Sequence, residues 1–176
     1  MELEIKQGYK QTEVGLIPED WNIGILTNVT ELITDGAHLS PPTSNSGYPI
    51  VTVENINKGY IDIPSCRIIS KTDYDYLVRN NCKPLKGDVL LSKDGTIGIT
   101  FTIKKNRDIV LLSSIALIRP KKNNLDGQYL SYSFESEWFY KFLNRVKGGS
   151  ALKRIVLRDI AKYIIGLPPT LSLIHI

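Results

Sequence analysis

The sequence predicts an α+β fold, with a strongly twisted, strand-rich mixed sheet, one long helix and several short helices. Short β-branched segments of alternating polarity fill the centre of the chain, between residues 50 and 120. Residues 127–147 instead repeat apolar side chains at helical spacing. The 176 residues are 42% hydrophobic and 23% charged, which is ordinary globular usage and excludes a disordered or low-complexity chain.

The N-terminal part of the chain predicts an arm and a long loop, and the segment between them fits either a strand or a helix. Residues 1–20 predict an extended arm with a turn, and Trp21 is expected to anchor this arm to the core. Residues 22–33 mix strand and helix spacing, so both classes stay open. Residues 35–49 combine three prolines, two glycines and four Ser or Thr with almost no apolar periodicity, which predicts a loop. Long loops in compact domains are usually functional or disordered.

The centre of the chain predicts strands and one short helix. Ser70 and Asp73 have the spacing of a capping box, so a short helix is expected from there through about Asn80. Strands are expected at 50–56, at 60–64, on both sides of a tight turn at Asp94-Gly95 within 87–103, and, as a pair or as one long bent strand, at 109–120.

The C-terminal part predicts the longest helix, over residues 127–147. Leu130, Phe134 and Trp138 lie at i+4 steps, so this stripe is expected in the core rather than as a platform for bases. Asp126 can cap the start of the helix. Residues 155–169 predict a strand, a short turn of helix and a second strand. The expected organisation is an arm (1–20), one domain (21–169) and a tail (170–176).

The sequence contains no complete motif for catalysis. It lacks G-x-G-x-x-G and the P-loop, and neither the two histidines nor Cys66 and Cys82 have the spacing of a metal site. We therefore expect no catalytic residue, no metal, no cofactor and two buried free thiols. The apolar runs are too short to cross a bilayer and the N-terminus lacks a signal peptide's apolar core, so a cytoplasmic protein is expected.

The charge of the chain is unevenly distributed. Residues 1–35 hold two Lys or Arg and seven Asp or Glu, whereas residues 141–162 hold seven Lys or Arg and one Asp. The basic segment is typical of a face that binds a polyanion, but a merely solvated basic surface fits equally well.

Several loops carry side chains that could contact DNA. In the long loop, His38, Asn45 and Tyr48 are candidates for reading base edges, although an ordinary polar loop has the same composition. Lys93 precedes the predicted tight turn and could project toward DNA, or serve only solubility. After Gly148-Gly149, the candidates for DNA contact are Ser150, Lys153 and Arg154.

Segments in a fixed order also follow the pattern of one known family. They are YKQTEVGLIPEDW from Tyr9, DGAHLSPPTSNSGYPIVTVENI from Asp35, LKGDVLLSKDGTIG from Leu85, SSIALIRP from Ser113 and GSALKRIVLRDIAKYIIGLPP from Gly149. The third of these is the most specific, because it is similar to the family element G-D-(V/I)-L-(L/F)-S-(R/K)-x-G-T-(I/V)-G. Over about residues 9–169, the chain resembles the target recognition domain of type I restriction-modification specificity subunits.

The resemblance implies a DNA-binding module that reads one half of a bipartite site on double-stranded DNA and has no catalysis of its own. It implies methyltransferase (M) subunits, which methylate adenine with S-adenosylmethionine, and restriction (R) subunits, which use ATP, as partners. The family usually continues into a spacer helix, and we expect residues 170–176 to be a truncated or non-native tail in its place. The alternatives are a small stand-alone DNA endonuclease and a protein-interaction domain.

Overall fold

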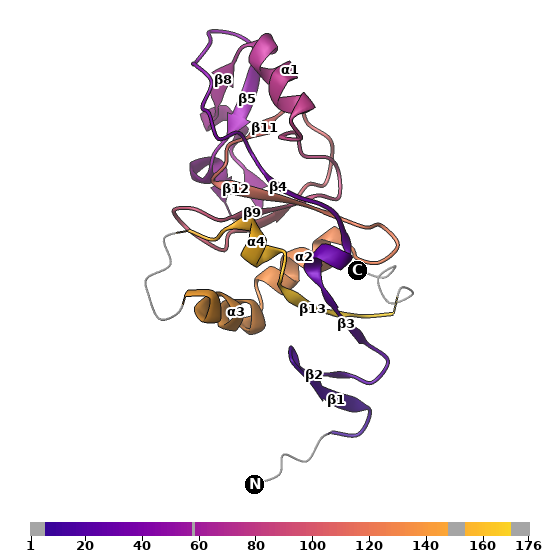
Figure 1. Ribbon diagram of the computed structural model, residues 1–176. Helices are drawn as coiled ribbons and strands as arrows, with labels where there is room; N and C mark the ends of the chain where they lie inside the picture. Colours follow the sequence, from indigo (N-terminus) through magenta and orange to yellow (C-terminus); the bar gives the residue numbers. More distant parts are fainter. Residues whose placement is uncertain (1–5, 58, 148–153, 170–176) are drawn as a thin grey trace.

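A four-stranded antiparallel sheet forms the middle layer of the molecule (Figure 1). The structure is a computed structural model and describes residues 6–57, 59–147 and 154–169. The sheet is ordered β10-β9-β12-β4, with bounds Thr100–Thr102, Val89–Ser92, Ile115–Pro120 and Thr30–Asp35. Its inner strands are apolar on both faces, because Leu90 and Leu117 enter one core cluster while Leu91 and Ile118 enter another. A sheet buried on both faces needs a layer above and a layer below.

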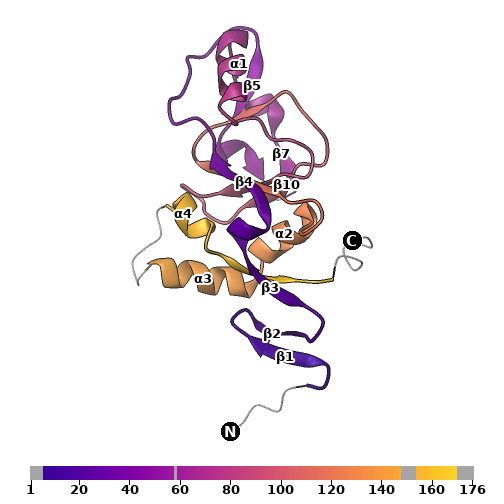
Figure 2. The same cartoon turned by 45° about the vertical axis from the view of Figure 1, so that its right-hand side comes forward.

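The lower layer consists of helices and a second small sheet (Figures 1 and 2). Its members are α2 (Gly127–Phe134), α3 (Glu137–Lys147), α4 (Leu157–Ile160) and the antiparallel pair β13-β3 (Ile164–Leu167 with Asn22–Ile25). Phe134, Phe139 and Tyr163 are almost fully buried against the underside of the sheet. The apolar stripe of residues 127–147 is therefore core, as the sequence predicts.

The structure divides the predicted long helix into two helices. α2 ends at Phe134 and α3 begins at Glu137. Between them, the Ser136 hydroxyl donates to the Ser133 carbonyl at 2.6 Å and accepts from the Phe139 amide at 3.3 Å. Serine competes in this way with the i to i−4 ladder, so the prediction of one continuous helix was wrong. The predicted cap is confirmed, since the Asp126 carboxylate accepts from the amides of Gln128 and Tyr129.

The upper layer is built on a three-stranded sheet. Its order is β11-β5-β8 (Val110–Leu111, Tyr48–Val51 and Arg67–Ile69), and β11 pairs with β5 in parallel. Helix α1 (Lys71–Arg79) packs beside it and is capped by Ser70, as predicted. Beside these lie the pair β6-β7 (Ile56–Asn57 with Tyr60–Ile61) and the short 3₁₀ turns η2 (Val53–Asn55) and η3 (Ile63–Ser65).

The strands predicted at 50–56 and 60–64 are shorter in the structure. Asn55 accepts from both the amide and the hydroxyl of Thr52, which turns the chain out of β5 into η2. The second strand gives way to η3 at Ile63. The α+β class is confirmed, although the strands fall into several sheets. Among the named strands of the described residues, only β11 and β5 of the upper sheet pair in parallel.

The N-terminal arm is a hairpin at the lower end of the molecule (Figure 1). It pairs β1 (Tyr9–Thr12) with β2 (Gly15–Pro18) and leads to Trp21. The Trp21 ring packs edge-on against Tyr129, with centroids 6.0 Å apart, as the predicted anchor requires. The undecided segment 22–33 becomes β3, the 3₁₀ turn η1 (Leu26–Asn28) and most of β4. No helix in the described part of the chain is long and apolar enough to cross a membrane.

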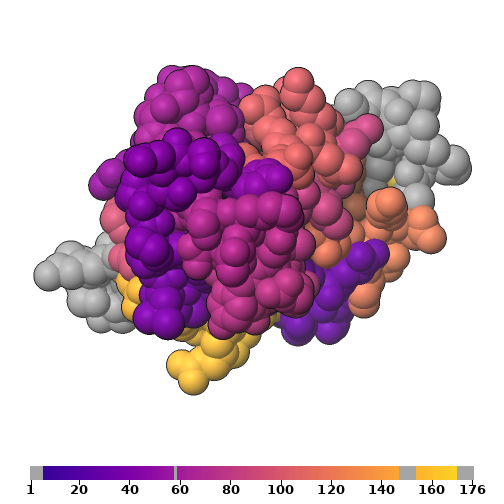
Figure 3. Space-filling view, turned by 90° about the horizontal axis from the view of Figure 1, so that it is seen from above, coloured from indigo at the N-terminus to yellow at the C-terminus, as the bar shows by residue number. Residues whose placement is uncertain are grey.

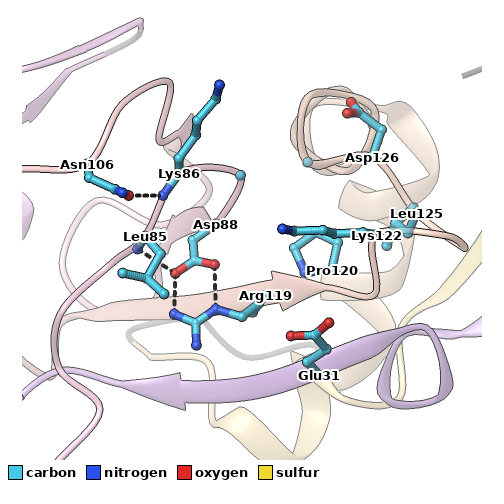
Figure 4. Close-up of a pocket in the computed structure, with 12 residues that line it drawn as sticks. Glu31, Leu85, Lys86, Asp88, Asn106, Arg119, Pro120, Lys122, Leu125 and Asp126 are labelled. Carbon is cyan, nitrogen blue, oxygen red and sulfur yellow. Dashed lines mark hydrogen bonds and ion pairs between the residues drawn. The ribbon is translucent and has the colours of Figure 1, made fainter. Parts of the chain in front are cut away.

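The central sheet has two chemically different ends. Asp35 and Ser92 lie at the end where β12 begins, whereas Thr30 and Val89 lie at the end where β12 finishes. The second end carries a pocket of about 670 Å³ (Figure 4). There Arg119 donates two 2.8 Å hydrogen bonds to Asp88, which is 1% exposed, and these bonds raise the pKa of Arg119. Of the sequence candidates for DNA contact that the structure describes, His38, Lys93 and Arg154 lie at the first end. Tyr48 and the loop that carries Asn45 lie beside β8 in the upper layer.

Candidate nucleic-acid interface

Asp35, the last residue of the edge strand β4, lies at the first end of the sheet. Its side chain is only 11% exposed, and its two oxygens point to different partners. One oxygen lies 3.1 Å from the Lys93 ammonium. The other lies 3.2 Å from Nε2 of His38, whose side chain is 74% exposed. One carboxylate thus contacts both the start of the long loop and the end of β9. The sequence analysis missed Asp35, because its partner Lys93 is distant along the chain.

Lys93 is buried, with 4% of its side chain exposed. Its amide donates to the Ser114 carbonyl at 2.9 Å, and its carbonyl accepts from the Ile155 amide at 2.8 Å. A buried ammonium group needs a carboxylate partner, because a buried charge without one is strongly destabilising. The sequence led us to expect a lysine that projects toward DNA from a turn. Its burial argues instead for a role in holding the surrounding segments together.

The start of the long loop is pressed against the main chain that leads into β12. A Cβ on Gly36 would lie 2.1 Å from the Leu111 carbonyl oxygen, so only glycine fits there. Next to it, the Ala37 amide donates to the same carbonyl at 2.8 Å, and the Ser113 amide donates to the Ala37 carbonyl at 3.0 Å. These contacts fix the direction in which the loop leaves the sheet.

Arg67 of β8 orders the middle of the loop. Its guanidinium donates to the Pro41 carbonyl at 2.8 Å and also to the hydroxyls of Ser40 and Thr43. Figure 3 looks down on this region, where residues 38–47 (dark purple) lie along the magenta segment that contains α1. The sequence gives no local signal for this role, because Arg67 belongs to an ordinary strand pattern.

The other two loop candidates differ in exposure. Asn45 is exposed on the loop. Tyr48 is half-buried, and its ring stacks on Tyr74 with centroids 4.0 Å apart and planes 16° apart. One face of the Tyr48 ring is therefore covered by Tyr74.

The connection between β9 and β10 completes this end of the sheet. It contains Gly95 and Gly98, both with positive φ, and is wider than the predicted tight turn, since β10 begins only at Thr100. Ser92 closes its base, because its hydroxyl accepts from the Ile99 amide at 2.8 Å. Asp94 pairs with the exposed Arg154 at 2.9 Å, which brings part of the basic segment 141–162 to this connection.

The basic segment is only partly described. Ser150 and Lys153 lie outside the described residues. Within them, Lys141 pairs with Glu137 at 3.1 Å, and the Arg145 guanidinium lies 4.6 Å from the centre of the Trp138 ring. Several of these cations thus have partners within the protein. No group of three or more His, Cys, Asp or Glu side chains in the described ranges could hold a metal ion.

Segments far apart in the sequence therefore meet at one end of the central sheet. Asp35 and His38 come from the second of the family-like segments, and Lys93 and Asp94 from the third. Ser114 comes from the fourth and Arg154 from the fifth. Motifs that are separate in the sequence therefore come together at one place in the fold.

Comparison with known proteins identifies the family of the chain. The sequence profile described as "Type I restriction modification DNA specificity domain" matches residues 18–172. The chain belongs to this family. It is 27% identical over 172 residues to the putative type I restriction enzyme MjaX specificity subunit of Methanocaldococcus jannaschii, with 93% of the chain and 39% of that protein covered. It is 26% identical over 157 residues to the EcoBI specificity subunit of Escherichia coli, with 87% and 32% covered.

Solved structures share the fold of this specificity domain. The HsdS subunit from Thermoanaerobacter tengcongensis superposes with a TM-score of 0.63 at 20% identity, over 96% of the chain and 38% of that subunit. The S subunit from M. genitalium has a TM-score of 0.52 at 14% identity, over 93% of the chain and 36% of that subunit. The chain spans less than two fifths of the length of these subunits and of the two curated relatives.

Proposed function

We propose that this specificity domain binds double-stranded DNA in a sequence-dependent manner and reads one half of a bipartite site for a type I restriction-modification complex. Family membership supports this function. The observation that carries it is the convergence of four of the five family-like segments around Asp35 and Lys93 at one end of the sheet. The domain has no catalytic role in this proposal, and methyltransferase and restriction subunits supply the chemistry. We also propose that it works in the cytoplasm.

Exposed side chains at this end of the sheet and on the long loop have the chemistry that base recognition needs. An asparagine such as Asn45 can bond adenine through its amide, and an imidazole such as that of His38 can donate or accept at a base edge. An arginine such as Arg154 can bind either guanine or phosphate. We propose these three as DNA contacts, with Lys93 and Tyr48 in supporting roles. Ser150 and Lys153 remain predicted contacts outside the described residues.

Selection from a randomised duplex library tests the function. The purified chain should enrich one short sequence, and its affinity for that duplex should fall steeply as salt rises. Failure to enrich any sequence would favour a protein-interaction domain. Metal-dependent cleavage of the duplex by the purified chain would favour an endonuclease.

Arg154 and Asp94 provide a matched pair of variants for the same assay. Arg154→Ala should lower the log–log salt slope by about 0.9 if the guanidinium binds a phosphate. Asp94→Asn should leave DNA affinity unchanged or increase it. The substitution removes a carboxylate that repels phosphate and releases Arg154 from its 2.9 Å ion pair. Equal DNA affinity for both variants and the parent at every salt concentration would place Arg154 away from DNA.

A further inference from the structure

We propose that Asp35 and Lys93 are positioning residues that lock three DNA-facing segments into one rigid arrangement without touching DNA themselves. The inference rests on the proposed function and extends it to residues that control specificity. The pair is buried, with side chains 11% and 4% exposed and charged atoms 3.1 Å apart. Groups so well covered contact a duplex poorly, but they can fix the groups that do contact it.

The ion pair spans strands that do not touch. In the order β10-β9-β12-β4, strand β12 separates β9 from β4, so no main-chain ladder joins the end of β9 to the end of β4. The Asp35–Lys93 contact crosses the start of β12 and supplies that connection. Apart from this pair, the loop after β4 is held by Leu111 and Arg67. The connection after β9 is held by Ser114 and Arg154.

The same two residues reach a third segment and also orient one side chain. The Lys93 carbonyl accepts from the Ile155 amide, which places Arg154 beside Asp94. The second Asp35 oxygen contacts His38 at 3.2 Å, so this carboxylate also sets the direction of the imidazole ring. The buried Asp35–Lys93 pair thereby fixes the positions of His38, Arg154 and the connection after β9.

We expect the Asp35–Lys93 pair to contribute to DNA specificity rather than to stability. A buried ion pair is often no more stabilising than an apolar pair of similar volume, whereas removing one partner leaves an uncompensated charge. The double variant Asp35→Asn/Lys93→Met should therefore fold better than either single variant, and it is the informative protein.

The chain offers a matched control at the other end of the same sheet. Asp88, buried just before β9, forms an ion pair at 2.8 Å with the partly exposed Arg119 of the neighbouring strand β12 (Figure 4). The control variant is Asp88→Asn/Arg119→Met. It perturbs β9 and its neighbour β12 in the same sheet but lies away from the proposed DNA face.

The test compares the affinity of each protein for the selected duplex and for a random duplex. Asp35→Asn/Lys93→Met should lose about tenfold in the ratio of specific to random binding, with an unchanged salt slope. The control should keep that ratio at matched fraction folded. A folded Asp35→Asn/Lys93→Met protein that keeps the parent's ratio would overturn the proposal. A salt slope lower by about 0.9 would also overturn it, because Lys93 would then bind a phosphate.

Amide hydrogen exchange tests the coupling without DNA. In Asp35→Asn/Lys93→Met, residues 36–47 and 94–99 should exchange faster together, while the control should leave both segments protected. Unchanged protection of both segments would contradict the locking role. If the parent selects no sequence, the proposed function fails at that step, and hydrogen exchange still decides whether the pair holds the loops.

Discussion

Gly36 illustrates how a single residue can control the path of a loop. Its missing side chain lets the main chain of the loop lie directly on the segment that leads into β12, where a Cβ would come within 2.1 Å of the Leu111 carbonyl oxygen. The neighbouring amide of Ala37 depends on the same approach for its 2.8 Å hydrogen bond. A larger residue would therefore move the loop as well as strain the packing.

Gly36→Ala should lower the free energy of unfolding by about 2–3 kcal/mol, because the clash involves main-chain atoms that cannot rotate away. Urea unfolding followed by circular dichroism measures this loss. Gly59→Ala is the control, since its Cβ would meet no atom within 4 Å and only its φ of +88° is unfavourable. A loss for Gly36→Ala no larger than that for Gly59→Ala would show that the loop tolerates a side chain there.

At the scale of the element, local capping decides where helices begin and end. Ser70 and Asp126 each cap the helix that follows, and both are visible in the sequence. Ser136 is equally local, yet its signal is weaker because the apolar stripe continues across it from α2 into α3. Periodicity identifies the buried face of both helices but does not show that the main chain is interrupted.

Asp126→Ala should destabilise the protein by about 1 kcal/mol, because the amides of Gln128 and Tyr129 lose their acceptor at the start of α2. Thermal unfolding measures the change. Asn123→Ala, at an exposed position just before the cap, should have a much smaller effect. Equal effects for the two variants would mean that the cap contributes nothing beyond surface composition.

At the scale of the whole molecule, several buried groups that lose a proton at high pH make the stability of the fold decrease as pH rises. Burial raises the pKa of Cys66 to about 11 and that of Tyr129 to about 12, and it also raises the pKa values of Cys82 and Tyr163. Both cysteines are free and buried, as the sequence predicts. In the unfolded chain these thiols ionise near their ordinary value of 9.0.

The protein should therefore lose stability on the alkaline side. Between about pH 9 and pH 11 the unfolded chain binds fewer protons than the folded one, so the free energy of unfolding falls as pH rises. Urea unfolding at several pH values measures the slope, which should be smaller in Cys66→Ala than in the parent. Parallel slopes for the two proteins would show that the Cys66 thiol does not contribute.

The sequence by itself determined the α+β class, the apolar stripe of residues 127–147, the caps of α1 and α2, and the family-like order of the motifs. These features depend on residues that are close in sequence, where spacing and side-chain chemistry act directly. Only the tertiary structure decided the burial of Lys93, the stacking of Tyr48, the role of Arg67 and the contacts of Asp35. Each of those depends on a partner that comes from a distant segment of the chain. Whether a charged or aromatic side chain is exposed or paired is set by that partner, and local pattern carries no information about it.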